Sequence, residues 1–151
     1  MLTHATRTIS LALLALVAGC NTEGPTTPIT FVGPASLVIT DLRTGAGETL
    51  AQGQQATVHY ALWLYDPRNT DSKGTLLEDS RQLGSASQGF TIRIATDAVI
   101  EGWVQGLPGM KVGGLRRLVI PPSLAFGDTG SQGIPPNAWL VFDVDLLAVR
   151  N

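Results

Sequence analysis

The chain has 151 residues, of which 44% are hydrophobic and 15% are charged, a composition typical of one folded domain and not of a disordered protein. Ten Lys and Arg stand against twelve Asp and Glu, so the net charge is −2 and no basic surplus indicates a nucleic-acid partner. The single Cys excludes an intramolecular disulfide and a Cys-rich zinc site, and the two His exclude a multi-His metal centre.

The N-terminal segment has the pattern of an export signal. Residues 11–18 are almost wholly apolar and follow Arg7, and this run is shorter than the roughly 20 residues that a membrane-spanning helix needs. The tetrapeptide Val17-Ala18-Gly19-Cys20 resembles the lipobox of bacterial lipoproteins, in which cleavage precedes a lipid-carrying Cys. We therefore expect a lipoprotein signal peptide at residues 1–19 and a lipid on Cys20. The alternative is an ordinary signal peptide followed by an unrelated Cys.

Lipidation would anchor the protein to a membrane of the bacterial cell envelope, with the domain facing the periplasm or the exterior. Residues 20–35 comprise Cys20 and a segment rich in Pro, Thr and Gly, which predicts a flexible, extended tether. Residues 36–151 then form the folded domain.

Alternating hydrophobicity predicts the strands of this domain. Segment 54–65 is the clearest, with Ala56, Val58, Tyr60, Leu62 and Leu64 on one face. The polar, turn-rich segment 66–74 suggests a hairpin connection. Further strands are expected at residues 36–40, 90–94, 115–120 and 139–149.

Two of these strands have distinct faces. The inward positions are Phe90, Ile92 and Ile94 in the first, and Leu140, Phe142, Val144 and Leu146 in the last. Asp143 and Asp145 then point outward, where we expect a solvated face and not a cation site.

A short helix is predicted over residues 98–105, with Asp97 as its N-cap. Its residues are mostly apolar, so it needs cover, which the concave face of the sheet can supply. The expected fold is α+β, a bent antiparallel sheet of four to six strands wrapped around one short α-helix. The long Gly- and Pro-rich connection at 121–137 is of a length that tends to be functional.

Six short segments follow one another with compatible spacing. They are Val58-His59-Tyr60, Glu78-Asp79-Ser80, Val99-Ile100-Glu101-Gly102-Trp103, Gly113-Gly114-Leu115-Arg116-Arg117-Leu118-Val119-Ile120-Pro121-Pro122, Leu124-Ala125-Phe126-Gly127 and Leu140-Val141-Phe142-Asp143-Val144. Together, over about residues 37–149, they resemble the FKBP-type peptidyl-prolyl cis-trans isomerases. The resemblance implies the same bent sheet around one helix.

The resemblance also implies a proline-binding pocket that presents Trp103 as its floor. Its matching positions are Tyr60, Phe90, Val99, Ile100, Trp103 and Phe142. Leu77 stands where the family usually has Phe, Glu78 where it has Asp, and Phe126 where it has Tyr. Because Asp79 is adjacent, either Glu78 or Asp79 could occupy the position of the family's Asp. Ile134 would belong to the same flap as Phe126.

The implied activity is rotation about Xaa-Pro bonds in exported proteins, with neither a metal nor a cofactor. The implied partners are proline-containing unfolded or partly folded proteins, the membrane that holds the anchor, and the macrolide ligands of the family. Two alternatives remain open: a non-catalytic chaperone or proline-peptide binding module of the same fold, and a purely structural envelope domain. Taken alone, Trp103 and Phe142 are more typical of a core than of a pocket, and Tyr60 is also compatible with a buried core residue whose hydroxyl is hydrogen-bonded.

Overall fold

A computed structural model of the chain describes residues 29–83, 88–95 and 98–151. The predicted signal peptide, Cys20 and the expected cap Asp97 lie outside the described residues. Among the residues that are described, no helix is long and apolar enough to cross a membrane.

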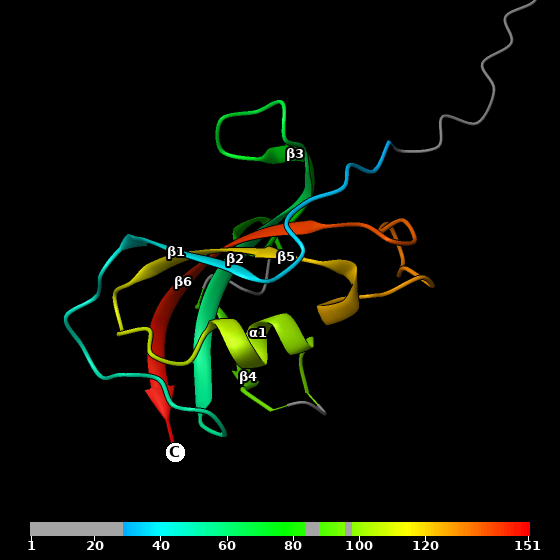
Figure 1. The fold of residues 1–151 in the computed structure, drawn as a ribbon. Helices are drawn as coiled ribbons and strands as arrows, with labels where there is room; N and C mark the ends of the chain where they lie inside the picture. Colours follow the sequence, from blue (N-terminus) through cyan, green and yellow to red (C-terminus); the bar gives the residue numbers. More distant parts are fainter. Residues whose placement is uncertain (1–28, 84–87, 96–97) are drawn as a thin grey trace, which may run out of the picture.

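The described residues form one antiparallel sheet with a short helix against one face (Figure 1). The sheet order is β1-β5-β6-β2-β3, and β4 pairs with β2 beside β3. The strands are β1 (Val38–Arg43), β2 (Gln55–Tyr65), β3 (Lys73–Asp79), β4 (Phe90–Arg93), β5 (Leu115–Ile120) and β6 (Leu140–Arg150). The helix is α1 (Glu101–Gly106), and two 3₁₀ turns are η1 (Ser80–Gln82) and η2 (Pro122–Leu124).

Strand β2 organises the sheet because it has partners along both edges. Strand β6 pairs along one edge from Gln55 to Leu64. On the other edge, β4 pairs with the first half of β2 and β3 with the second half. The change of partner opens a gap in this edge, and the candidate site lies beside it.

The predicted strand pattern is confirmed in β2, β4, β5 and β6, each within one residue at either end. Strand β1 lies at 38–43, not at 36–40, and β3 begins inside the segment predicted as a loop. Every residue of β1 is exposed, so no alternation of buried and exposed positions in the sequence marks its ends.

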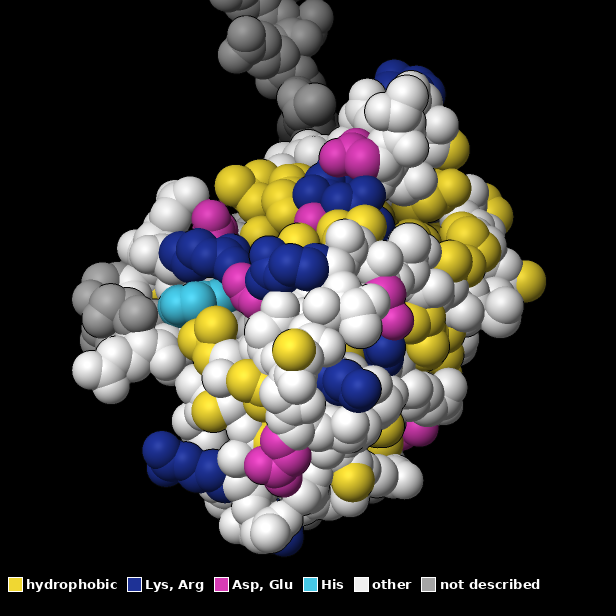
Figure 2. Space-filling view, turned by 90° about the vertical axis from the view of Figure 1, so that its left-hand side faces the viewer, with side chains coloured by type: hydrophobic (Ala, Val, Ile, Leu, Met, Phe, Trp, Pro, Cys, Tyr) yellow, Lys and Arg dark blue, Asp and Glu magenta, His cyan; other side chains and the backbone are white. Residues whose placement is uncertain are grey.

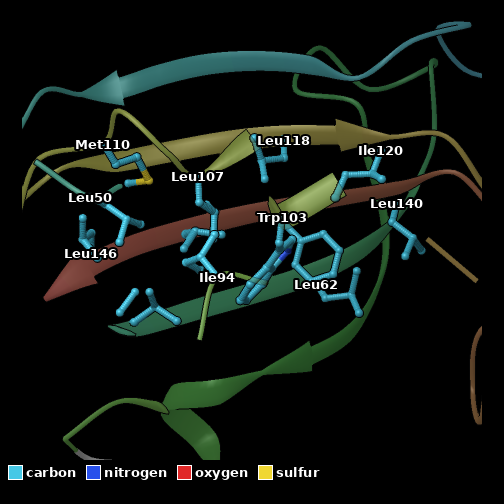
Figure 3. Packing of buried hydrophobic residues seen from close by; sticks show 14 of the residues in the cluster. Leu50, Leu62, Ile94, Trp103, Leu107, Met110, Leu118, Ile120, Leu140 and Leu146 are labelled. Atoms are coloured by element: carbon cyan, nitrogen blue, oxygen red, sulfur yellow. The ribbon is translucent and has the colours of Figure 1, made fainter. Parts of the chain in front are cut away.

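The inward faces of β2 and β6 form the core together with α1 and the segments that flank it (Figure 3). Tyr60 is half-buried, whereas the other predicted inward residues of β2 are buried. The largest fully buried side chains include Leu50, Ile94, Leu107, Leu118, Ile120, Leu140 and Leu146.

Helix α1 begins three residues later than the sequence predicts. Ile100 occupies the N-cap position with an extended backbone (φ −60°, ψ 147°) and no side-chain cap, so residues 98–100 approach the helix without belonging to it. The helix packs closely on β5. A Cβ at Gly102 would lie 2.5 Å from the Ile120 Cγ2, and one at Gly106 would lie 2.8 Å from the Leu118 Cδ2.

The last residues of the predicted tether contact the domain. The Trp139 Nε1–H donates to the Pro34 carbonyl at 3.0 Å, and the Arg68 guanidinium lies 4.6 Å from the centre of the Phe31 ring. Gly33 packs against the Trp139 ring, where a Cβ would approach to 2.5 Å.

The outer face of the sheet carries ion pairs, not the solvated carboxylates that the sequence predicts. Asp143 accepts from Arg117 at 2.7 and 2.9 Å and from Lys73 at 2.6 Å, and its side chain is only 14% exposed. Asp145 pairs with Arg43 at 3.0 Å and with Arg81 at 3.2 Å. Figure 2 shows dark blue and magenta side chains side by side on one face.

The Asp143 cluster predicts a loss of stability in acid. Burial raises the pKa of Asp143, but the hydrogen bonds from Arg117 and Lys73 outweigh burial and hold that pKa below its usual value. A carboxylate with a lowered pKa stabilises the fold above its unfolded pKa of about 3.9 and stops doing so as the pH falls through the folded value. We expect Asp143→Asn to lower the free energy of unfolding by about 1–3 kcal/mol at pH 7.

Urea denaturation at pH 7 and at pH 3 measures this effect. The stability difference between wild type and Asp143→Asn should shrink at the lower pH, because pH 3 lies below the unfolded pKa of the carboxyl and the unfolded wild type then gains a proton that the folded ion pair resists. Asp71→Asn, at an exposed carboxylate 3.9 Å from Lys73, is the matched control and should change stability little. A difference that stays constant with pH would contradict the assignment.

The close helix packing predicts that Gly102→Ala destabilises the protein. Alanine favours a helix by up to about 1 kcal/mol over glycine. The added methyl group would meet the buried Ile120, and overpacking of this kind costs about 1–3 kcal/mol. We expect a net loss of about 1–2 kcal/mol in thermal or urea unfolding. Gln105→Ala, on the exposed side of α1, should stay within about 0.5 kcal/mol, and equal effects of the two variants would count against the packing argument.

Candidate active site

A cavity of about 320 Å³ opens between α1, the inner face of the sheet and the β5–β6 loop. This volume is within the range of small-ligand pockets, about 300–1,000 Å³. The lining residues are Val58, Tyr60, Leu62, Glu78, Phe90, Ile92, Val99, Ile100, Trp103, Phe126, Ser131, Gln132, Ile134 and Phe142.

Aromatic rings form the deep part of the cavity. Trp103 comes from α1 and is 6% exposed, so it is at once a core residue and a wall of the cavity. Its indole meets the Tyr60 ring edge-on at 5.4 Å and the Phe142 ring edge-on at 5.3 Å between centroids. Phe90 adds a fourth ring, 5.9 Å from that of Tyr60. Such T-shaped contacts orient the rings relative to one another.

A polar pair stands among these rings. The Tyr60 hydroxyl donates a short hydrogen bond to the Glu78 Oε1. Burial raises the pKa of Tyr60, and the hydrogen bond and charge of Glu78 raise it further, so the phenol stays protonated and remains a donor. Glu78 lines the cavity, whereas Asp79 turns away and accepts the Arg81 N–H at 3.0 Å. The structure thereby decides which of the two neighbouring carboxylates faces the site.

The structure brings together all but one of the predicted pocket residues. Those that line the cavity are Tyr60, Glu78, Phe90, Val99, Ile100, Trp103, Phe126, Ile134 and Phe142. Leu77 does not line it. The β2–β3 register shifts between Leu62 and Trp63, which leaves Leu77 without a partner in the ladder, and its side chain packs against the hydrophobic cluster.

Five further lining residues were not predicted from the sequence. Val58, Leu62 and Ile92 lie on the predicted inward faces of β2 and β4, so the same alternation could have identified them as candidates. Ser131 and Gln132 belong to the long β5–β6 loop, where no periodicity indicates which side chains face inward.

Backbone hydrogen bonds hold that loop in shape. The Gly130 N–H donates to the Phe126 carbonyl at 3.0 Å, and Ser131 and Ile134 bond to each other in both directions at 3.0 and 2.8 Å. Gly130 has φ +70°, and a Cβ there would lie 2.5 Å from the Ile134 carbonyl oxygen, so the turn requires glycine. The loop therefore presents Phe126 and Ile134 to the cavity from a defined backbone.

The arrangement is suited to a compact apolar ring with hydrogen-bonding groups near it. Aromatic and aliphatic side chains supply most of the lining, and Tyr60, Glu78, Ser131 and Gln132 supply polar atoms. Within the described part of the chain, no cluster of three or more His, Cys, Asp or Glu could hold a metal ion. His59 is not among the lining residues.

Comparisons with known proteins agree with this geometry. The family model of FKBP-type peptidyl-prolyl cis-trans isomerase matches residues 46–147. An FK506-binding protein from Neisseria meningitidis serogroup A is 42% identical over 115 residues, which cover 76% of this chain and 96% of that protein. FkpA from Escherichia coli K12, an FKBP-type peptidyl-prolyl cis-trans isomerase, is 40% identical over 76% of this chain but only 38% of its own length.

Solved structures give the same result. The crystal structure of Escherichia coli FkpA superimposes with a TM-score of 0.63 at 39% identity and covers 76% of this chain and 48% of that one. AtFKBP13 superimposes with a TM-score of 0.62 at 33% identity and covers 78% of this chain and 95% of that one. These matches confirm the predicted α+β fold, and the chain belongs to the FKBP-type peptidyl-prolyl cis-trans isomerase family.

Proposed function

We propose that this protein accelerates rotation about Xaa-Pro bonds in exported proteins, with the proline ring held over Trp103. The open cavity of about 320 Å³ carries this proposal, because the aromatic residues pack around a space and do not fill it. The substrates are proline-containing unfolded or partly folded proteins, and macrolide ligands of the family would occupy the same cavity.

The chemistry requires no nucleophile. Rotation of a peptide bond has a barrier of about 18–20 kcal/mol, because the twisted bond loses amide resonance. The twisted bond is less polar than the planar one, so an apolar cavity favours it over the well-hydrated ground state. A difference of about 5 kcal/mol in the binding of the two forms would accelerate rotation by nearly 10⁴.

The side chains divide this work. Trp103, Phe142 and Phe90 contact the pyrrolidine ring. The edge-on packing of Trp103 against Phe142 keeps the cavity open before the substrate arrives. The hydroxyl of the protonated Tyr60 and the carboxylate of Glu78 are held together by their hydrogen bond. We call these polar atoms the hydrogen-bonding edge of the cavity, to which substrate amides align. Ser131 and Gln132 offer further polar atoms from the opposite loop.

Phe126 supports the second candidate, a non-catalytic proline-binding module. It lines the cavity with an apolar ring, where the family usually has a tyrosine. A hydroxyl donor to a neutral carbonyl contributes about 0.5–1.5 kcal/mol, so its absence reduces the rate by about tenfold at most. This loss is smaller than the acceleration that the cavity supplies, and we therefore prefer the catalytic proposal.

A protease-coupled isomerisation assay tests the role of Trp103. Trp103→Leu removes the aromatic floor and about 2–3 kcal/mol of apolar contact with the twisted substrate. We expect kcat/KM to fall by about thirtyfold to 160-fold. Trp63→Leu is the matched control, because Trp63 lies on the other face of β2 with Lys73 over its ring, and it should retain wild-type activity. An unchanged rate in folded Trp103→Leu would refute the proposal.

The variant Phe126→Tyr separates the two candidates within the same assay. A catalytic cavity should gain up to about tenfold in kcat/KM from the restored donor. A module that binds proline peptides without catalysis would show binding by calorimetry, no acceleration in the wild type, and no gain from the added hydroxyl.

We also propose that a lipid on Cys20 holds the domain close to a membrane. The Val17-Ala18-Gly19-Cys20 motif supports this proposal, as does the position of the chain's single Cys directly after the apolar run. The contacts of Phe31 and Pro34 leave about 10 residues between the lipid and the domain, a reach of about 31 Å when extended. At that distance, the cavity would meet polypeptides emerging at the membrane surface.

Metabolic labelling with an alkyne fatty acid in a bacterial host tests the anchor. The full chain should incorporate the label and fractionate with membranes, and mass spectrometry should find Cys20 as the first residue of the mature protein. Cys20→Ala should abolish labelling, because the sequence has no other Cys. Label that persists in Cys20→Ala, or a wild type without label, would contradict the assignment.

A further inference from the structure

Ser80 is a fully buried polar residue at the gap in the sheet edge. It has 0% exposure and is the first residue of η1, directly after β3. A buried hydroxyl is costly unless it is hydrogen-bonded, so its partners indicate what it holds in place. It is outside the lining of the cavity, and the function proposed above gives it no role.

The Ser80 hydroxyl takes the place of a missing strand partner. The β2–β3 ladder ends at Ala61 and Asp79, and the β2–β4 ladder begins at Val58 and Phe90. Tyr60 lies between the two ladders, and its backbone N–H donates to the Ser80 Oγ at 2.9 Å. A side-chain oxygen thus completes the hydrogen bonding of β2 where the chain leaves the sheet.

His59 holds the other side of this hydroxyl. Its Nδ1 lies 3.2 Å from the Ser80 Oγ. The hydroxyl accepts from the Tyr60 N–H, and it can donate its own proton to Nδ1 when the imidazole carries its hydrogen on Nε2. His59 faces outward beside Asp145, its partner in β6, which also pairs with Arg81 of η1.

Tyr60 and Glu78, the polar pair of the cavity, lie next to this contact, one on each of the two strands that it joins. Tyr60 donates the hydrogen bond to Ser80 from its own backbone N–H, and Glu78 is two residues before Ser80 on β3. The Tyr60 hydroxyl and the Glu78 carboxylate then meet inside the cavity. Fixing Ser80 against β2 fixes the separation of the two backbones that carry this pair.

We propose that Ser80, held by His59, is a positioning residue that sets the hydrogen-bonding edge formed by Tyr60 and Glu78. This inference rests on the proposed isomerase activity. Ser80 lies outside the cavity and affects turnover through Glu78. The aromatic walls that bind the proline ring stay unchanged.

The test is a double-mutant cycle on the full-length protein in the isomerisation assay. Ser80→Ala should lower kcat by about tenfold, the change that corresponds to one hydrogen bond, with KM near the wild-type value. Ser80→Cys, which keeps the size but weakens the acceptor, should fall in between. In a Glu78→Gln background, Ser80→Ala should cause little further loss, because its effect passes through Glu78.

A purely structural role gives a different pattern. Leu50→Val, at a buried core residue away from the cavity lining, is the control for lost stability and should leave kcat unchanged in folded protein. The inference would be wrong if Ser80→Ala lowered kcat by the same factor in the Glu78→Gln background as in the wild type. It would also be wrong if folded Ser80→Ala kept the wild-type kcat. Both outcomes leave the proposed function intact, because the wild type is still active. If Ser80→Ala does not fold, His59→Phe removes one hydrogen bond and should lower kcat by about threefold, and an unchanged rate there is equally decisive. An inactive wild type would overturn the proposed function and this inference with it.

Discussion

Helix α1 lies directly on β5 because the two residues that face the strand have no side chains. Any Cβ at Gly102 or Gly106 would enter the space of Ile120 or Leu118. This close approach brings Trp103, the residue after Gly102, under the inner face of the sheet, where its indole meets Tyr60 and Phe142 edge-on. The rings stand against one another and leave a space between them. The cavity is therefore a consequence of helix packing as much as of aromatic content.

The two faces of the sheet have separate electrostatic characters. On the outer face, each of the carboxylates Asp143 and Asp145 has two cationic partners, so its charge is neutralised where it is partly removed from water. On the inner face, Glu78 meets the neutral hydroxyl of Tyr60 among apolar walls. An apolar environment strengthens such a hydrogen bond, and the carboxylate of Glu78 keeps free lone pairs that can accept from a substrate amide. This separation suits a reaction whose activated state is less polar than its ground state.

Much of the fold could be predicted because its strands are amphipathic. In β2 and β6 the alternation is long and one face is buried, so a shift of one residue would reverse the burial of every side chain. The edge strand β1 has no buried face, and the start of α1 depends on Ile100, whose extended backbone no residue type requires. The position of Leu77 could not be predicted from local sequence either. It is next to Glu78 in the chain, but a register shift between β2 and β3 separates it from the cavity.

The sequence by itself determined the inward faces of the main strands, the apolar character of the helix, and the family resemblance through which the aromatic residues could be assigned to one pocket. Local periodicity and residue type are sufficient for these features because they depend on neighbours within a few residues. Tertiary structure alone decided the contributions of Ser131 and Gln132, the choice of Glu78 over Asp79, and the junction at Ser80. Each of these depends on how segments far apart in the chain meet, and no spacing in the sequence contains that information.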